Sequence, residues 1–115
     1  MADDWDDLGA MEATSRVLNA AIASGAGEVH LSPDTTGATI FLISAERIEF
    51  LAHVSAACWS RIKESLRGLA GIDSWKQTPV NGYGLFSHEG TECQVEVCLG
   101  RAEPQEDVVV RITRC

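Results

Sequence analysis

The segment that follows Ser55 constrains the fold of this 115-residue chain most. Its apolar side chains recur at one-turn spacing and fall on one face of a helix: Cys58, Trp59, Ile62, Leu66, Leu69 and Ala70. Ser55 suits the N-cap because its hydroxyl accepts a hydrogen bond from an unpaired first-turn amide. The pattern weakens at Gly68 and Gly71, so the sequence predicts an amphipathic helix between Ser55 and these glycines.

Strand patterns lie on both sides of this helix. Before it, the sequence predicts strands over residues 28–33 and 36–43, with a turn over residues 34–37, and the alternation over residues 47–51 leaves a third short strand open. After it, strands are predicted over residues 83–87, 92–99 and 108–112, with turns at Asn81–Gly82 and at residues 88–90. Residues 92–99 alternate apolar and polar side chains, which predicts one buried and one wet face. The continuous apolar run over residues 108–112 predicts an interior strand.

A further helix is predicted over residues 11–24, before Gly25 and Gly27. The resulting order is helix, two or three strands, helix, three strands. This order predicts an α+β two-layer sandwich, with a largely antiparallel sheet and the helices on one face. Residues 11–115 are expected to form this single domain, and residues 1–10 an acidic N-terminal tail.

The tail surrounds one tryptophan with four aspartates: Asp3, Asp4, Asp6 and Asp7 flank Trp5. One interpretation is a solvated tail that frays, as chain termini commonly do. The other is an acidic, aromatic peptide that binds a basic partner, because an indole ring is costly to leave in water.

Charge and hydropathy exclude some classes of function. The net charge is −8, and the nine basic residues are spread along the chain, which argues against nucleic-acid binding. No apolar run approaches the roughly 20 residues that span a bilayer, and the acidic N-terminus does not resemble a signal peptide. We expect a soluble, cytoplasmic protein without direct membrane insertion.

The cysteines and histidines show no metal-binding spacing, since no C-x-x-C occurs. The sequence predicts that the cysteines are buried free thiols in a reducing compartment, with Cys115 exposed at the end. Cys93 and Cys98 are five residues apart, so on one strand they would point to opposite faces. His30 is expected to be a half-buried histidine hydrogen-bonded to a loop rather than a ligand.

No catalytic motif is present in the sequence. It contains neither a P-loop, nor G-x-S-x-G, nor H-E-x-x-H. Glu92 and Glu96 fall on one strand face, but charges on a wet face are more typical of solubility than of catalysis. We therefore expect no enzyme activity and no cofactor.

Several segments together resemble the PAS-like N-terminal domain of the type II secretion and type IV pilus-assembly ATPases. They are Ala26-Gly-Glu-Val-His-Leu-Ser-Pro33, Arg61-Ile-Lys63, Ala70-Gly-Ile-Asp73, Pro79-Val-Asn-Gly82, and Val97-Cys-Leu-Gly100 with Val108-Val-Val-Arg-Ile112. They follow the family's order and spacing, and the similarity covers roughly residues 11–115. The resemblance implies a PAS-like fold.

The chain departs from this family where the family carries arginines. Residues 40–49 lack the arginine pair and the Asp-Gly turn, Tyr83 replaces the arginine after the Pro79–Gly82 segment, and Glu96 or its neighbour replaces another. Tyrosine and glutamate do not replace a guanidinium. The resemblance therefore implies a scaffold without the nucleotide-facing charges.

The expected function is a non-catalytic interaction or regulatory domain that binds a secretion or pilus ATPase, or another secretion-machinery protein. Partner contacts are expected near the N-terminus, at Asp3, Asp4, Trp5, Asp6 and Asp7, and also at Arg47 and Tyr83. Two alternatives stay open. One is the excised N-terminal domain of a full-length secretion ATPase, and the other is a PAS-like sensor that encloses a small molecule between sheet and helix.

Overall fold

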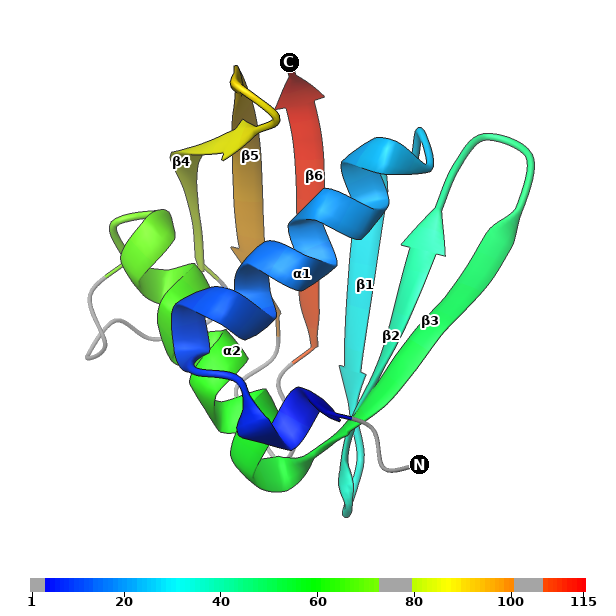
Figure 1. Ribbon diagram of the computed structural model, residues 1–115, viewed down its shortest axis with the longest axis vertical. Helices are drawn as coiled ribbons and strands as arrows, with labels where there is room; N and C mark the ends of the chain where they lie inside the picture. The colour runs from blue at the N-terminus through cyan, green and yellow to red at the C-terminus, as the bar shows by residue number, and fades with distance from the viewer. Residues whose placement is uncertain (1–3, 73–79, 101–106) are drawn as a thin grey trace.

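The protein is an antiparallel sheet with two helices on one face (Figure 1), in a computed structural model that describes residues 4–72, 80–100 and 107–115. In chain order the elements are η1 (Asp4–Asp7), α1 (Ala10–Ala23), β1 (Glu28–Pro33), β2 (Gly37–Ile43), β3 (Ile48–Ser55), α2 (Ala56–Leu69), β4 (Val80–His88), β5 (Thr91–Leu99) and β6 (Val108–Arg114). This arrangement confirms the predicted α+β two-layer architecture.

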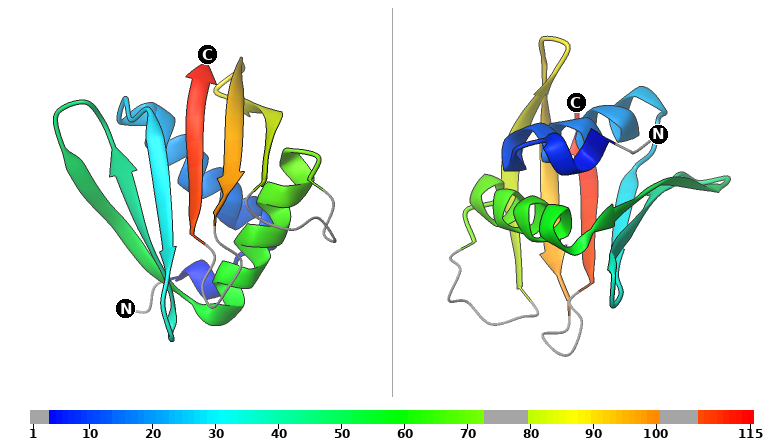
Figure 2. Two further views of the ribbon diagram at one scale, coloured as in Figure 1. Left: turned by 180° about the vertical axis from the view of Figure 1, so that it is seen from behind. Right: turned by 60° about the horizontal axis from the view of Figure 1, so that its bottom comes forward.

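The sheet has six strands in the order β3-β2-β1-β6-β5-β4, and every described pairing is antiparallel. It consists of two meanders, β1–β2–β3 and β4–β5–β6, that meet where β1 pairs with β6. The last strand is therefore interior, as its apolar run predicts. Seen from behind, the second face of the sheet is covered by no helix of the described residues (Figure 2).

Both helices bury the face that their apolar stripes predict. α1 buries Val17, Leu18 and Ala21, and α2 buries Ile62 and Leu66 against the sheet. The Ser55 hydroxyl accepts a hydrogen bond from the backbone N–H of Cys58 at 3.2 Å, which confirms the predicted N-cap. Gly71, at φ 69°, supplies the left-handed residue that ends α2.

The predicted turn at Asn81–Gly82 is wrong, because both residues lie inside β4. Gly82 faces the helices, and a Cβ atom there would lie 2.5 Å from the carbonyl oxygen of Ala70. The glycine therefore serves the close approach of the end of α2 to the sheet. The turn predicted at residues 88–90 is confirmed, with Glu89 and Gly90 at positive φ.

The described residues before α1 fold onto the domain, in contrast to the solvated tail expected for residues 1–10. Trp5 is only 8% exposed, its carbonyl accepts a contact from the Cys58 thiol at 3.7 Å, and the guanidinium of Arg16 lies 5.1 Å from its ring. Asp6 accepts a hydrogen bond from the Ser55 hydroxyl at 2.6 Å. The indole explains the difference, since a ring of this size gains more from burial than an acidic tail gains from fraying.

Two of the four cysteines are joined by a disulfide, Cys93–Cys115, which corrects the prediction of free thiols for this pair. The pairing of Gln94 with Arg114 places the two cysteines side by side at the ends of β5 and β6. Cys58 is buried and outside the disulfide, as predicted, and Cys98 is a half-buried free thiol on the opposite face from Cys93. Of the helices within the described residues, none has the length and apolar character to cross a membrane.

Candidate functional site

The face of the sheet opposite the helices, called here the uncovered face, carries most of the large exposed hydrophobic residues of the described chain. Met11, Ile48, Phe50, Tyr83 and Leu85 are the large exposed hydrophobic residues of the described chain, and all except Met11 lie on this face. The strand alternation explains the position of Tyr83 and Leu85, because the glycines between them and before them, Gly84 and Gly82, lie on the helix side of β4.

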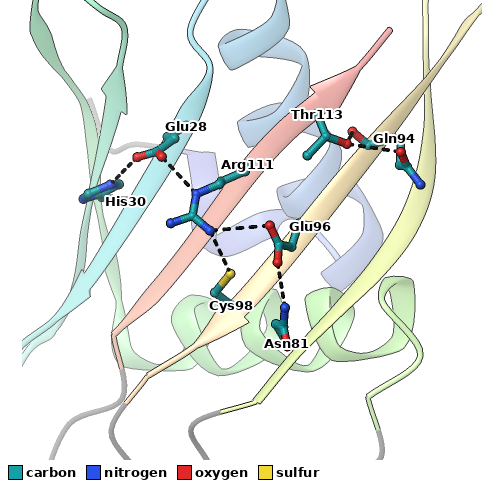
Figure 3. A network of polar contacts seen from close by, with 8 residues as sticks. All are labelled: Glu28, His30, Asn81, Gln94, Glu96, Cys98, Arg111 and Thr113. Carbon is teal, nitrogen blue, oxygen red and sulfur yellow. Dashed lines mark hydrogen bonds and ion pairs between the residues drawn. The ribbon is translucent and has the colours of Figure 1, made fainter.

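A polar network occupies the centre of the uncovered face (Figure 3). Arg111 on β6 lies between carboxylates on both neighbouring strands, with its Nε 3.1 Å from Glu28 Oε2 and its Nη1 3.4 Å from Glu96 Oε1. The Asn81 amide donates to Glu96 at 2.6 Å, and His30 Nε2 lies 3.0 Å from Glu28 Oε1. The network therefore joins β1, β6, β5 and β4.

Register explains why these residues meet. Arg111 is the direct partner of Glu28 in the β1–β6 pairing and of Glu96 in the β5–β6 pairing. Directly opposed side chains of opposite charge on one sheet face attract one another. The alternation in the sequence places Glu96 on a wet face. However, no local sequence pattern indicates that β1 and β6 pair with one another, so the sequence analysis did not predict the network.

The network shifts the pKa values of its members. The pKa of Glu28 is lowered by hydrogen bonds from His30 and Arg111, and that of Glu96 mainly by the hydrogen bond from Asn81. The pKa of Arg111 is raised, first by its hydrogen bond to Glu28. Both carboxylates are therefore held in the charged form, which is the reverse of what a general acid at neutral pH requires. Glu92, which shares a strand face with Glu96, is exposed near the start of β5.

Cys98 lies at the edge of the network, where Arg111 Nη1 is 3.5 Å from its sulfur. Burial, followed by the charge of Glu96, raises the pKa of the Cys98 thiol. A raised pKa disfavours the thiolate, which is the reactive form. The cysteine is thus not activated for nucleophilic attack.

A second surface feature, called here the β2–β3 patch, consists of Phe41, Ile43, Ile48 and Phe50. The strand register pairs Phe41 with Phe50 and Ile43 with Ile48, so all four share the uncovered face. The two phenyl rings meet edge to face at 6.4 Å, while Ile48 and Phe50 remain 68% and 62% exposed. A depression of about 310 Å³ lies at the start of β1 and the β2–β3 turn, where Glu28 of the network and Ile43 of the patch both line it.

His30 is half exposed, as predicted, but its partner is Glu28 on the same strand rather than a loop. The two residues are two positions apart on one strand, so they share a face.

A cluster at the β1–β2 turn brings together Asp34, Thr36 and His53. Asp34 Oδ1 accepts from the backbone N–H and the hydroxyl of Thr36, and His53 Nε2 lies 3.2 Å from both Asp34 Oδ2 and Thr36 Oγ1. The backbone hydrogen bond from Thr36 is the main cause of the lowered pKa of Asp34. A hydrolase relay needs the carboxylate and the hydroxyl on different ring nitrogens. Here both approach the same nitrogen, so the cluster holds a turn together.

The residues predicted as partner contacts do not form one surface. Trp5 is buried, Asp6 is bound to Ser55, and Asp7 is exposed beside α1. Asp3 and the side chain of Asp4 lie outside the described residues.

Arg47 and Tyr83 lie toward opposite edges of the sheet. Arg47 is exposed in the β2–β3 turn, 3.7 Å from Glu49, whereas Tyr83 is exposed on the uncovered face of β4. The charge of Glu96 raises the pKa of the Tyr83 hydroxyl. Of the predicted residues whose side chains the structure describes, Tyr83 alone lies beside the polar network.

Among residues 4–72, 80–100 and 107–115, no three His, Cys, Asp or Glu side chains are arranged to hold a metal ion. Comparison with models of protein families finds no match for this chain, and comparison with curated proteins finds none either. The resemblance to the secretion ATPases therefore stays a prediction that depends on the residues quoted for it.

Proposed function

We propose that this chain is a non-catalytic interaction domain whose β2–β3 patch anchors a protein partner on the uncovered face. The observation that carries the proposal is the exposure of Ile48 and Phe50 next to Phe41 and Ile43. Clustered exposed apolar side chains with polar neighbours are typical of protein interfaces. The hydrogen-bonded Arg111 network beside the patch supplies the polar neighbours.

The partner that the sequence favours is a secretion or pilus ATPase, or another protein of that machinery, and the PAS-like relationship is part of the same proposal. The net charge of −8 favours a basic partner surface. Electrostatic attraction of this kind contributes mainly to the association rate and to specificity. The apolar patch supplies the affinity.

The proposal is tested by measuring binding of this chain to a purified secretion ATPase by calorimetry, at low and at high salt. Phe50→Asp places a charge in the patch, and we expect it to weaken binding at least about tenfold, or ~1.4 kcal/mol. Met11→Asp is the matched control, because Met11 is equally exposed but lies on α1.

Two results would contradict the proposal. One is an absence of binding at both salt concentrations to any protein of the machinery. The other is an equal effect of Phe50→Asp and Met11→Asp, which would mean that the added charge weakens binding wherever it is placed.

The small-molecule sensor is the second candidate function, and one observation favours it. A groove of about 280 Å³ lies between the helices and β4, lined by Met11, Thr14, Leu69 and Phe86 among others. A ligand that binds only the native state stabilises it by about 2.7 kcal/mol at a hundredfold excess over its Kd. Thermal unfolding with nucleotides and metabolites tests this candidate, and an unchanged Tm throughout would contradict it.

A further inference from the structure

The groove between the helices and β4 has a lining without charge. It lies where the first turns of α1, the last turns of α2 and β4 come together (Figure 1). Besides the four residues already named, Ser15, Ser65 and Gly68 line it, and none of the described lining residues has an ionisable side chain. An ion or a phosphate placed here would lose its water without gaining a charged partner. The lining therefore favours a neutral ligand.

Thr14 brings a buried hydroxyl to this groove. The residue is 5% exposed, and no atom of the described residues lies within hydrogen-bond reach of its Oγ1. A buried hydroxyl that has no partner lowers stability, whereas an apolar group of the same shape would not. Because Thr14 itself lines the groove, a polar group of a ligand bound there can supply the partner that the hydroxyl lacks.

The rest of the lining suits an aromatic ring. Phe86 lies on the helix side of β4, Leu69 faces it from α2, and the Met11 sulfur accepts a hydrogen bond from the Ser65 hydroxyl at 3.5 Å. A phenyl ring and a thioether sulfur both pack favourably against aromatic rings. The volume of about 280 Å³ is at the lower end for ligand pockets, so it suits a molecule of about one ring.

We propose that this groove binds a neutral aromatic molecule of the phenol class, whose single hydroxyl pairs with the Thr14 hydroxyl. The inference rests on the second candidate function, the small-molecule sensor, and names the class of its ligand. The groove is on the helix side of the sheet and the β2–β3 patch is on the uncovered face, so ligand and protein partner can bind at the same time.

Titration of the full chain with phenol and with toluene, followed by NMR, tests the inference. The two probes differ in that a methyl group replaces the hydroxyl, and Thr14→Val makes the same change in the protein. We expect the ratio of the toluene Kd to the phenol Kd to fall at least about threefold in Thr14→Val, because one hydrogen bond is lost. Using the ratio removes the effect of the more apolar character of toluene.

A second variant locates the binding site. A Cβ atom added at Gly68 meets no heavy atom within 4 Å, so Gly68→Leu fills part of the groove without displacing backbone. We expect this variant to raise the Kd of phenol at least about tenfold. Ser60→Leu is the matched control, since Ser60 is exposed on the same helix but does not line the groove, and it should leave the Kd unchanged.

Three results would each overturn the inference. They are an absence of phenol binding to the wild-type chain, an unchanged phenol Kd in Gly68→Leu, and an equal change of both Kd values in Thr14→Val. The sensor function fails separately, if nucleotides and metabolites leave the Tm unchanged. A metabolite that raises the Tm of the wild type and of Gly68→Leu equally would retain the sensor but assign its site elsewhere, against this inference.

Discussion

At the scale of single residues, missing Cβ atoms set the distance between α2 and the sheet. Gly82 and Gly84 lie on the helix side of β4, directly beneath the end of α2, and added side chains there would meet the carbonyl oxygens of Ala70 and Leu69. Gly68, within the last turn of α2, has no heavy atom near the position of an added Cβ. A change from glycine to alanine is therefore expected to lower stability beneath α2, at Gly82 or Gly84, and to raise it within α2, at Gly68.

We expect Gly82→Ala to lower the free energy of unfolding by about 1–3 kcal/mol, because backbone has to move to admit the methyl group. We expect Gly68→Ala to raise it by about 0.5–1 kcal/mol, because alanine favours the helix. Urea unfolding measures both. Equal effects of the two substitutions would mean that the close packing of Gly82 against Ala70 does not limit stability.

At the scale of elements, the end of β6 is held to β5 by more than its ladder of hydrogen bonds. The Cys93–Cys115 disulfide joins the strand ends, and the Thr113 hydroxyl donates to the Gln94 carbonyl at 3.1 Å. A disulfide between residues 22 apart restricts the unfolded chain.

We expect reduction of this disulfide to lower the free energy of unfolding by about 2–4 kcal/mol. Unfolding with and without reductant measures the effect, and Cys115→Ser is expected to reproduce the reduced value. Cys98→Ser is the matched control, since Cys98 is a free thiol on the same strand as Cys93 but on the opposite face of the sheet. Alkylation of the unfolded, unreduced protein is expected to label Cys58 and Cys98 alone; labelling of all four cysteines would contradict the bond.

The helices and strands were largely predictable, whereas the way they meet was not. Periodicity located both helices, the Ser55 cap and five of the six strands, because these signals are local, and it left β3 open. The prediction of a turn at Asn81–Gly82 was wrong because glycine occurs both in turns and where backbones pack closely, and the sequence alone does not distinguish these two roles. The Arg111 network and the Cys93–Cys115 bond depend on strand neighbourhoods that arise only when distant segments pair.

At the scale of the whole molecule, the Arg111 network connects the two meanders through side chains. Glu28 belongs to the first meander, while Glu96 and Arg111 belong to the second. The pKa values of both glutamates are lowered in the folded state, Glu28 by His30 and Arg111 and Glu96 mainly by Asn81.

We expect these contacts to make stability depend on acidity. A carboxylate with a lowered folded pKa contributes stability above its unfolded pKa, about 4.3 for Glu, and loses that contribution as the pH falls through the folded value. The urea midpoint should therefore fall on acidification below about pH 4.3. The double variant Glu28→Gln, Glu96→Gln should show a smaller fall, and the exposed Glu92→Gln should match the wild type. Identical acid profiles for all three proteins would show that the network adds no stability.

The single junction between the meanders also determines the order in which the chain can fold. Pairing within a meander joins neighbouring strands, but the Glu28–Arg111 contact closes a separation of 83 residues. Loop-closure entropy and high contact order make such a step slow compared with hairpin formation. Before it occurs, β1 and β6 are edges as well as β3 and β4, so an intermediate with two separate meanders exposes twice the unpaired backbone of the native sheet. The apolar strand β6 is then open to pairing with other chains, and the rate at which it joins β1 governs how long the protein is exposed to aggregation.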